Sequence, residues 1–290
     1  MTDALLFDPA RHEALTDRPW SAASARAAID RIVACTLAEY RPGAGWTAHP
    51  LDDPDAPGQC CEPLYHGSAG VLLALRHLAR RSVKAPLPGD AVDLLAAHRV
   101  RLAADLADYR HGSASFLLGT TGIDLLRWRL TGDDTLLAPL HAAVAGNLHN
   151  PVREQLWGNP GTVLAAITLA EATGDPRWAD LVRAAADALE AELAWDASLD
   201  AWIWQQDLYG RQQRLLGAGH GFAGNVFPFL RGAAWLPTDQ VERVLAKALQ
   251  TLQTTALRDG ALLNWLPDAG GDADGAAPTG SATGAASTRA

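Results

Sequence analysis

The sequence predicts an all-α protein, an α/α toroid built from helical hairpins. Four Gly-x-x-Gly frames, at 67–70, 119–122, 158–161 and 221–224, each open an apolar, helix-forming run. More polar segments with helical periodicity alternate with these runs, and no stretch shows convincing strand alternation. Because a helix that is apolar on every side is a buried helix, we expect an inner layer of helices skirted by amphipathic outer ones.

The individual elements follow from periodicity and from the Gly and Pro residues between the runs. The sequence predicts inner helices over 71–78, 123–130, 162–172 and 226 to about 235. It predicts outer helices over 21–40, 90–108, 135–148, 177–193 and 238 to about 257. The tryptophan-rich stretch 195–209 is expected to be an irregular insert.

Three regions differ in composition. Residues 1–20 are expected to be an irregular lead-in, and residues 21–268 a single partial toroid. Residues 269–290 consist almost entirely of Gly, Ala, Ser, Thr and Asp. With nothing apolar to offset the entropy of ordering, we expect this tail to be disordered.

Charge and hydropathy narrow the class of partner. The formal net charge is −9 and no cluster of Lys and Arg is present, which argues against nucleic acid. No apolar run reaches the roughly 20 residues that span a bilayer, so we expect no integral membrane segment. The first ten residues carry Asp3 and Asp8 and do not resemble a secretory signal. The expected location is the cytoplasm.

Three further stretches carry a resemblance to a known family. They are Glu154-x-x-Trp157-Gly158-x-x-Gly161, Gly217-Ala218-Gly219-His220-Gly221-x-Ala223-Gly224 and Asn264-Trp265-x-Pro267. Together with the four frames, these motifs resemble the lanthionine synthetase C-like (LanC-like) family over residues 20–268. The resemblance implies a seven-fold α/α toroid in which zinc activates a thiol that adds to a dehydroamino acid of a peptide. A peptide or a small thiol is therefore the implied substrate.

The zinc ligands of that family have no match here. The family places cysteine two residues before the Gly of its fifth repeat and a Cys-His pair in its sixth. At superficially similar positions this chain has Leu156 and Gly219. We therefore expect no metal to be bound by this chain, although zinc is expected in complete family members. The resemblance covers about four of seven repeats, which implies a truncated and inactive form.

Two residues are candidates for chemistry and one for substrate binding. The resemblance makes His220 a general acid or base, a role suited to its unperturbed pKa near neutral pH. Glu154 could orient a substrate or assist proton transfer. The alternatives are a histidine that is hydrogen-bonded at a helix start and a carboxylate favoured by the helix dipole. Trp265 is the candidate for substrate binding, with packing as its alternative.

Several functions stay open at this point. The first is the LanC-like thiol addition, inactive in this chain, and the second is a non-catalytic peptide-binding remnant or scaffold. A carbohydrate-acting α/α barrel is a third, although it needs two carboxylates and only Glu154 is a credible member. An incomplete ring also leaves repeat faces uncapped, which predicts self-association.

Overall fold

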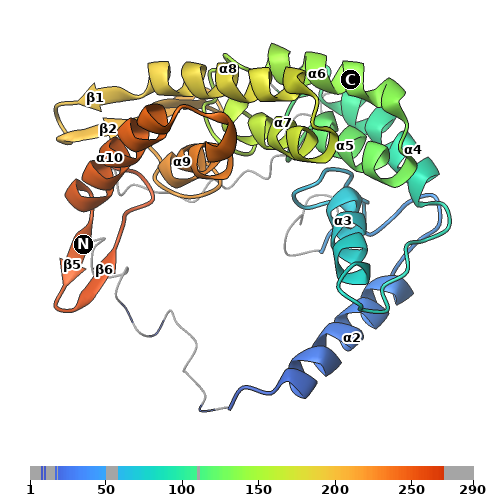
Figure 1. Cartoon of the computed structure of the whole chain (residues 1–290). Coiled ribbons are helices and arrows are strands. Elements are labelled where there is room, and N and C mark those ends of the chain that lie inside the picture. The colour runs from blue at the N-terminus through green and yellow to red at the C-terminus, as the bar shows by residue number, and fades with distance from the viewer. Residues whose placement is uncertain are drawn as a thin grey trace, which may run out of the picture.

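A computed structural model describes residues 19–49, 58–109 and 112–270, together with Asp8, Ala10 and Asp17. The described residues are mainly α-helical, which agrees with the predicted dominance of helices, and these helices follow one another along an arc (Figure 1). None of the described helices is both long and apolar enough to cross a membrane. Most of the predicted lead-in 1–20, and all of the predicted tail beyond residue 270, lie outside the described residues.

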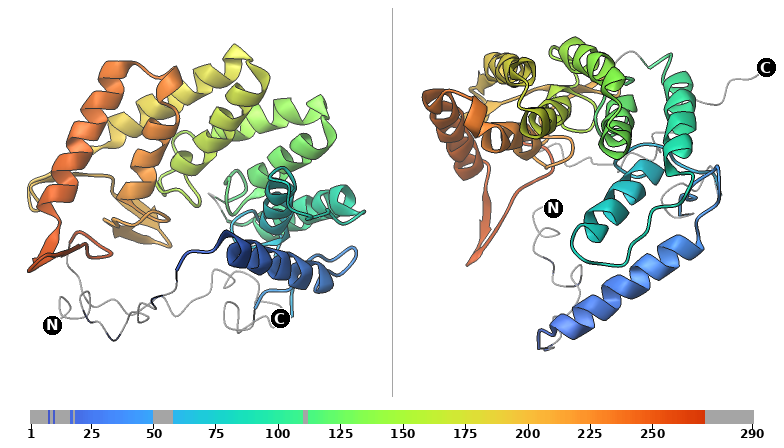
Figure 2. Two further views of the ribbon diagram at one scale, coloured as in Figure 1. Left: turned by 60° about the horizontal axis from the view of Figure 1, so that its bottom comes forward. Right: turned by 45° about the vertical axis from the view of Figure 1, so that its right-hand side comes forward.

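Outer and inner helices alternate along the chain. The α-helices are α2 (Ala22–Ala38), α3 (Ser68–Ala79), α4 (Ala91–Asp105), α5 (Thr120–Thr131), α6 (Leu137–Gly146), α7 (Asn159–Thr173), α8 (Pro176–Glu192), α9 (Phe222–Arg231) and α10 (Thr238–Thr254). Two short 3₁₀ turns, η2 (Asp134–Leu136) and η3 (Ala233–Trp235), precede α6 and α10. Figure 2 shows α2 and α10 at opposite ends of the arc in both views.

The four glycine frames have one shape. In each frame the first glycine is the N-cap residue with an extended backbone, and the inner helix begins at the next residue. The second glycine is the third residue of the helix. A Cβ at Gly161 would overlap the carbonyl oxygen of Gln155, six residues earlier, and the other three frames repeat this close approach. Only glycine lets the preceding loop fold back this tightly over a helix start.

Helix α7 is the most deeply buried element. It begins after Gly158, has Pro160 in its first turn where no amide hydrogen is needed, and ends at Gly174 in the left-handed conformation with φ of 68°. Its neighbours are α5, α6, α8 and α9. The main core cluster extends from α7 to fully buried Trp178 and Trp204, so these two tryptophans serve packing.

The prediction of an irregular insert at 195–209 is wrong. Residues 194–213 form two antiparallel hairpins, β1 (Ala194–Asp196) with β2 (Ala201–Ile203) and β3 (Gln206–Leu208) with β4 (Arg211–Gln213). A third hairpin pairs β5 (Leu257–Asp259) with β6 (Leu262–Asn264). Each strand has three residues, which is too short for alternation to be read from a sequence window. Tyr209 and Gly210 form the turn between β3 and β4. Both residues have positive φ, as a type I′ turn requires.

Candidate functional site

Glu154 lies in the loop between α6 and α7, and its side chain is fully buried. Its Oε2 accepts the amide hydrogen of Leu156 at 3.0 Å, and its Oε1 accepts that of Trp157. A buried carboxylate is costly unless it is hydrogen-bonded, and donors in this number offset much of that cost. The local backbone therefore fixes the position of this carboxylate.

His220 immediately precedes the glycine that caps α9, and its Nδ1 lies 2.9 Å from Glu154 Oε2. A carboxylate accepts hydrogen bonds and donates none, so the proton of this bond belongs to Nδ1. The imidazole is 39% exposed, and its Nε2 is not hydrogen-bonded to any other described residue. The arrangement is a histidine–carboxylate dyad whose outer nitrogen is available to take or give a proton.

Two further hydrogen bonds join the loops that carry this dyad. The amide of Gln155 donates to the carbonyl of Gly219 at 3.2 Å. The side chain of Asn225 in α9 donates to the carbonyl of Arg153 at 2.8 Å. Two residues that the sequence singled out, 66 positions apart, are thus held together at the adjacent starts of α7 and α9.

Two tyrosines that the sequence analysis missed, Tyr109 and Tyr209, contact Trp157 of the motif that contains Glu154. The indole of Trp157 donates to the hydroxyl of Tyr209 at 3.2 Å, and its ring lies 4.9 Å from that of Tyr109. Burial, with added repulsion from nearby negative charges, raises the pKa of Tyr109 to about 12. Burial also raises the pKa of Tyr209, helped by the Glu154 charge and opposed by the Trp157 bond. Both hydroxyls keep their protons at neutral pH and can donate hydrogen bonds.

Trp265 is placed differently. It is half-buried against the main core cluster, and its indole nitrogen donates to the carbonyl of Leu252 at 2.9 Å. An isolated bridge between Leu215 and Asp268, with the amide of Leu216 donating to the carbonyl of Pro267 at 2.9 Å, brings this segment beside the fourth glycine frame. Among the described residues, no hydrogen bond or ring contact joins Trp265 to His220 or Glu154.

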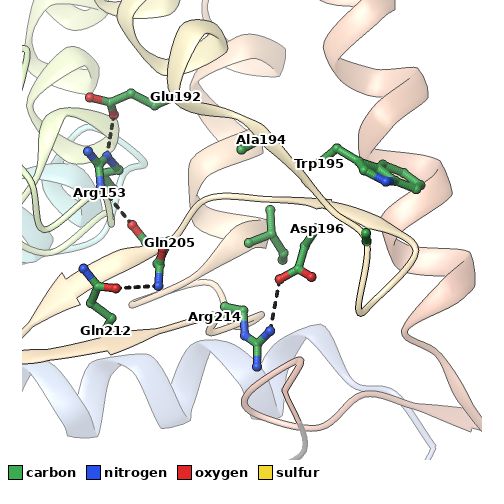
Figure 3. Close-up of a pocket in the computed structure, with 10 residues that line it drawn as sticks. Arg153, Glu192, Ala194, Trp195, Asp196, Gln205, Gln212 and Arg214 are labelled. Atoms are coloured by element: carbon green, nitrogen blue, oxygen red, sulfur yellow. Dashed lines mark hydrogen bonds and ion pairs between the residues drawn. The ribbon is translucent and has the colours of Figure 1, made fainter.

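A cavity of about 550 Å³ lies between α8 and the first two hairpins (Figure 3). Arg153 Nε lies 3.0 Å from Glu192 Oε2, and Arg214 Nη1 lies 3.0 Å from Asp196 Oδ2. The Asp196 pKa is lowered by a hydrogen bond from Ser198 and then by Arg214. Neither dyad residue lines this cavity, but Arg153 precedes Glu154 in the chain.

The residues present do not fit a zinc ion. Leu156 and Gly219 offer no ligand atom where the resemblance suggested one. Across the described part of the chain, no group of three or more His, Cys, Asp or Glu side chains is arranged to hold a metal. Cys35, Cys60 and Cys61, none of them in a disulfide, lie in the N-terminal part of the chain, away from the dyad in sequence.

The scan against protein-family models finds no match, and neither does the search of curated proteins.

Proposed function

We propose that this chain is a LanC-like helical-repeat protein that has the acid–base half of a thiol-addition site and lacks the metal half. The observation that carries the proposal is the 2.9 Å contact between His220 Nδ1 and a fully buried Glu154. The four equivalent glycine frames and the arc of alternating helices in Figure 1 support the toroidal architecture.

The dyad would act on the second step of the addition. When a thiolate attacks the β-carbon of a dehydroamino acid, a C–S bond forms and the π electrons move to the α-carbon and its carbonyl. The imidazolium of His220 would give its Nε2 proton to that α-carbon, and the neutral ring would then recover a proton from the next thiol or from water. Glu154 would hold the ring and stabilise its cationic form.

The first step of the addition is the ionisation of the thiol, and the described residues give no support for it. A free cysteine thiol has a pKa of about 8.5, so only a few per cent is thiolate at pH 7. The residues that would bind an activating metal are absent from the matching positions, as described above. We therefore propose that the chain does not form thioethers from ordinary alkyl thiols.

The proposal predicts different rates for two classes of substrate, aryl thiols and alkyl thiols. An aryl thiol, which is already ionised at pH 7.5, does not need activation, so its addition to a dehydroalanine peptide should be accelerated by the dyad. We expect an acceleration of about 100-fold, the lower end for general acid–base catalysis. His220→Ala should abolish it, and His77→Ala, an exposed histidine on α3, should not. Absence of acceleration, or an equal acceleration for an alkyl thiol, would contradict the proposal.

The carbohydrate-acting alternative loses support from the same geometry. Glycoside hydrolysis needs a carboxyl pair that flanks the sugar bond. The two oxygens of Glu154 already accept from Leu156, Trp157 and His220. A non-catalytic peptide-binding role is the second candidate, and the cavity beside Arg153 is the observation that favours it.

Self-association is a further part of the proposal. Large apolar side chains are exposed at the α10 end of the arc: Phe227, Leu230, Leu249, Leu252, Leu262 and Leu263. Exposed apolar side chains in this number favour association, so we propose that a second copy of this chain covers them. Sedimentation velocity over a 100-fold dilution tests this idea, and a monomer at every concentration would contradict it.

A further inference from the structure

The β1–β2 sheet has an open edge. Within the described part of the chain it contains only these two strands, so the outer edge of β1 has no neighbouring strand there. The cavity in Figure 3 is lined by four consecutive residues, 194–197, which include all of β1. The lining also includes Ile203 of β2, which is paired with Ala194, so the cavity borders one face of this hairpin as well as the backbone of β1.

The pairing within this hairpin shows which backbone groups face that edge. Trp195 is opposite Trp202, whose amide donates to Thr251 Oγ1 at 3.0 Å and whose carbonyl accepts from the same hydroxyl at 2.8 Å. Both backbone groups of Trp202 therefore point away from β1. Opposed antiparallel residues either exchange both hydrogen bonds or neither. The N–H and C=O of Trp195 consequently point away from β2, toward the open edge.

These two groups are available to a ligand. Outside the β1–β2 ladder, neither the amide nor the carbonyl of Trp195 is hydrogen-bonded to another described residue. The indole of Trp195 packs edge-on against Trp202, with ring centroids 5.5 Å apart, and Figure 3 shows it directed away from Arg153 and Gln205. Trp195 therefore presents its backbone to the cavity.

The charged side chains of the cavity define the ligand further. One ion pair, Arg153 with Glu192, and another, Arg214 with Asp196, belong to the lining, so the formal charges cancel. A nucleotide or an anionic lipid headgroup would need an excess of positive charge. A peptide backbone carrying side chains of both signs matches a neutral lining with paired charges.

We infer that this cavity binds an extended peptide segment, which adds to β1 as a third strand and pairs with the backbone of Trp195. The three residues of β1 span about 10 Å, and the 550 Å³ cavity lies within the size range of ligand sites. The inference rests on the proposed function for the class of ligand, since that function acts on peptides. Arg153, which lines the cavity, is the residue before Glu154 in the chain.

The first test uses the ligand. The probe is fluorescein-labelled Lys-Val-Thr-Val-Glu amide, which contains no dehydroamino acid, and fluorescence anisotropy measures its binding to the full chain. Single N-methylation is introduced at each peptide amide in turn. Strand pairing predicts alternation, with methyl groups on one set of alternate amides weakening binding at least 10-fold and those between them having little effect. Equal effects at all positions, or no saturable binding, would overturn the inference.

The second test uses two matched variants. Ala194 lines the cavity, whereas Ala191, three residues earlier on α8, does not, and both are exposed. Ala194→Phe should weaken binding at least 10-fold, and Ala191→Phe should leave it within 2-fold. Equal binding by the two variants would count against the site. His220→Ala should bind the probe normally, so a failure of peptide binding is distinguishable from a failure of the proposed chemistry.

Discussion

Replacement of Glu154 by glutamine tests how the dyad is held. In its best orientation the glutamine oxygen takes the place of Oε2, which accepts from Leu156 and His220, and the new NH₂ group then faces the amide of Trp157. Two donors then oppose each other in a fully buried site, which leaves one amide hydrogen without an acceptor. Such a loss costs about 1–3 kcal/mol. We expect Glu154→Gln to lower the free energy of unfolding by about 2 kcal/mol.

The matched variant is His220→Ala. It removes one hydrogen bond from a partly exposed ring and leaves Glu154 with both backbone donors, so its cost should be below about 1 kcal/mol. Urea unfolding followed by far-UV circular dichroism measures both variants. Both should lose the aryl-thiol reaction, while only Glu154→Gln should lose substantial stability. A Glu154→Gln protein as stable as the wild type, or less harmed than His220→Ala, would refute this description of the dyad.

Three further predictions concern the scaffold. Gly161→Ala should cost about 3 kcal/mol in a urea titration because its Cβ would meet the Gln155 backbone, whereas Gly146→Ala, with open space around it, should cost nothing. Burial, assisted by the charge of Arg101, lowers the pKa of His98 to about 4, below its unfolded value near 6.5. The neutral ring therefore stabilises the fold above pH 6.5, and about 3 kcal/mol should be lost as the pH falls to 4, a loss absent from His98→Gln. Trp265→Phe should lower stability by about 1 kcal/mol through the lost bond to Leu252 and leave the aryl-thiol rate within 2-fold; a larger fall in rate would favour a substrate contact.

The sequence was most informative where the backbone demands a particular residue. Glycine at Gly67, Gly119, Gly158 and Gly221 marked the start of each inner helix, because the close approach of the preceding loop excludes any side chain. The helical class followed from the same pattern. The hairpins were missed because strands of three residues carry no readable periodicity, and Tyr209-Gly210 is a weaker turn signal than Asn-Gly.

The site was predictable in part. His220 and Glu154 were each identified from a motif beside a glycine frame, but their 2.9 Å contact depends on two loops that meet only in the folded chain. Tyr109 and Tyr209 reach Trp157 from separate segments, and no spacing in the sequence relates them. The cavity beside Arg153 depends on hairpins that the sequence did not reveal.

The tautomer of His220 is the most direct test of the central claim. A long-range ¹H–¹⁵N correlation spectrum of the selectively labelled protein, recorded where the ring is neutral, distinguishes a protonated Nδ1 from a protonated Nε2. The hydrogen bond to Glu154 predicts that Nδ1 carries the proton and that Nε2 is the free base. A ring protonated on Nε2 would direct its Nδ1 lone pair at the carboxylate and would contradict the existence of the dyad.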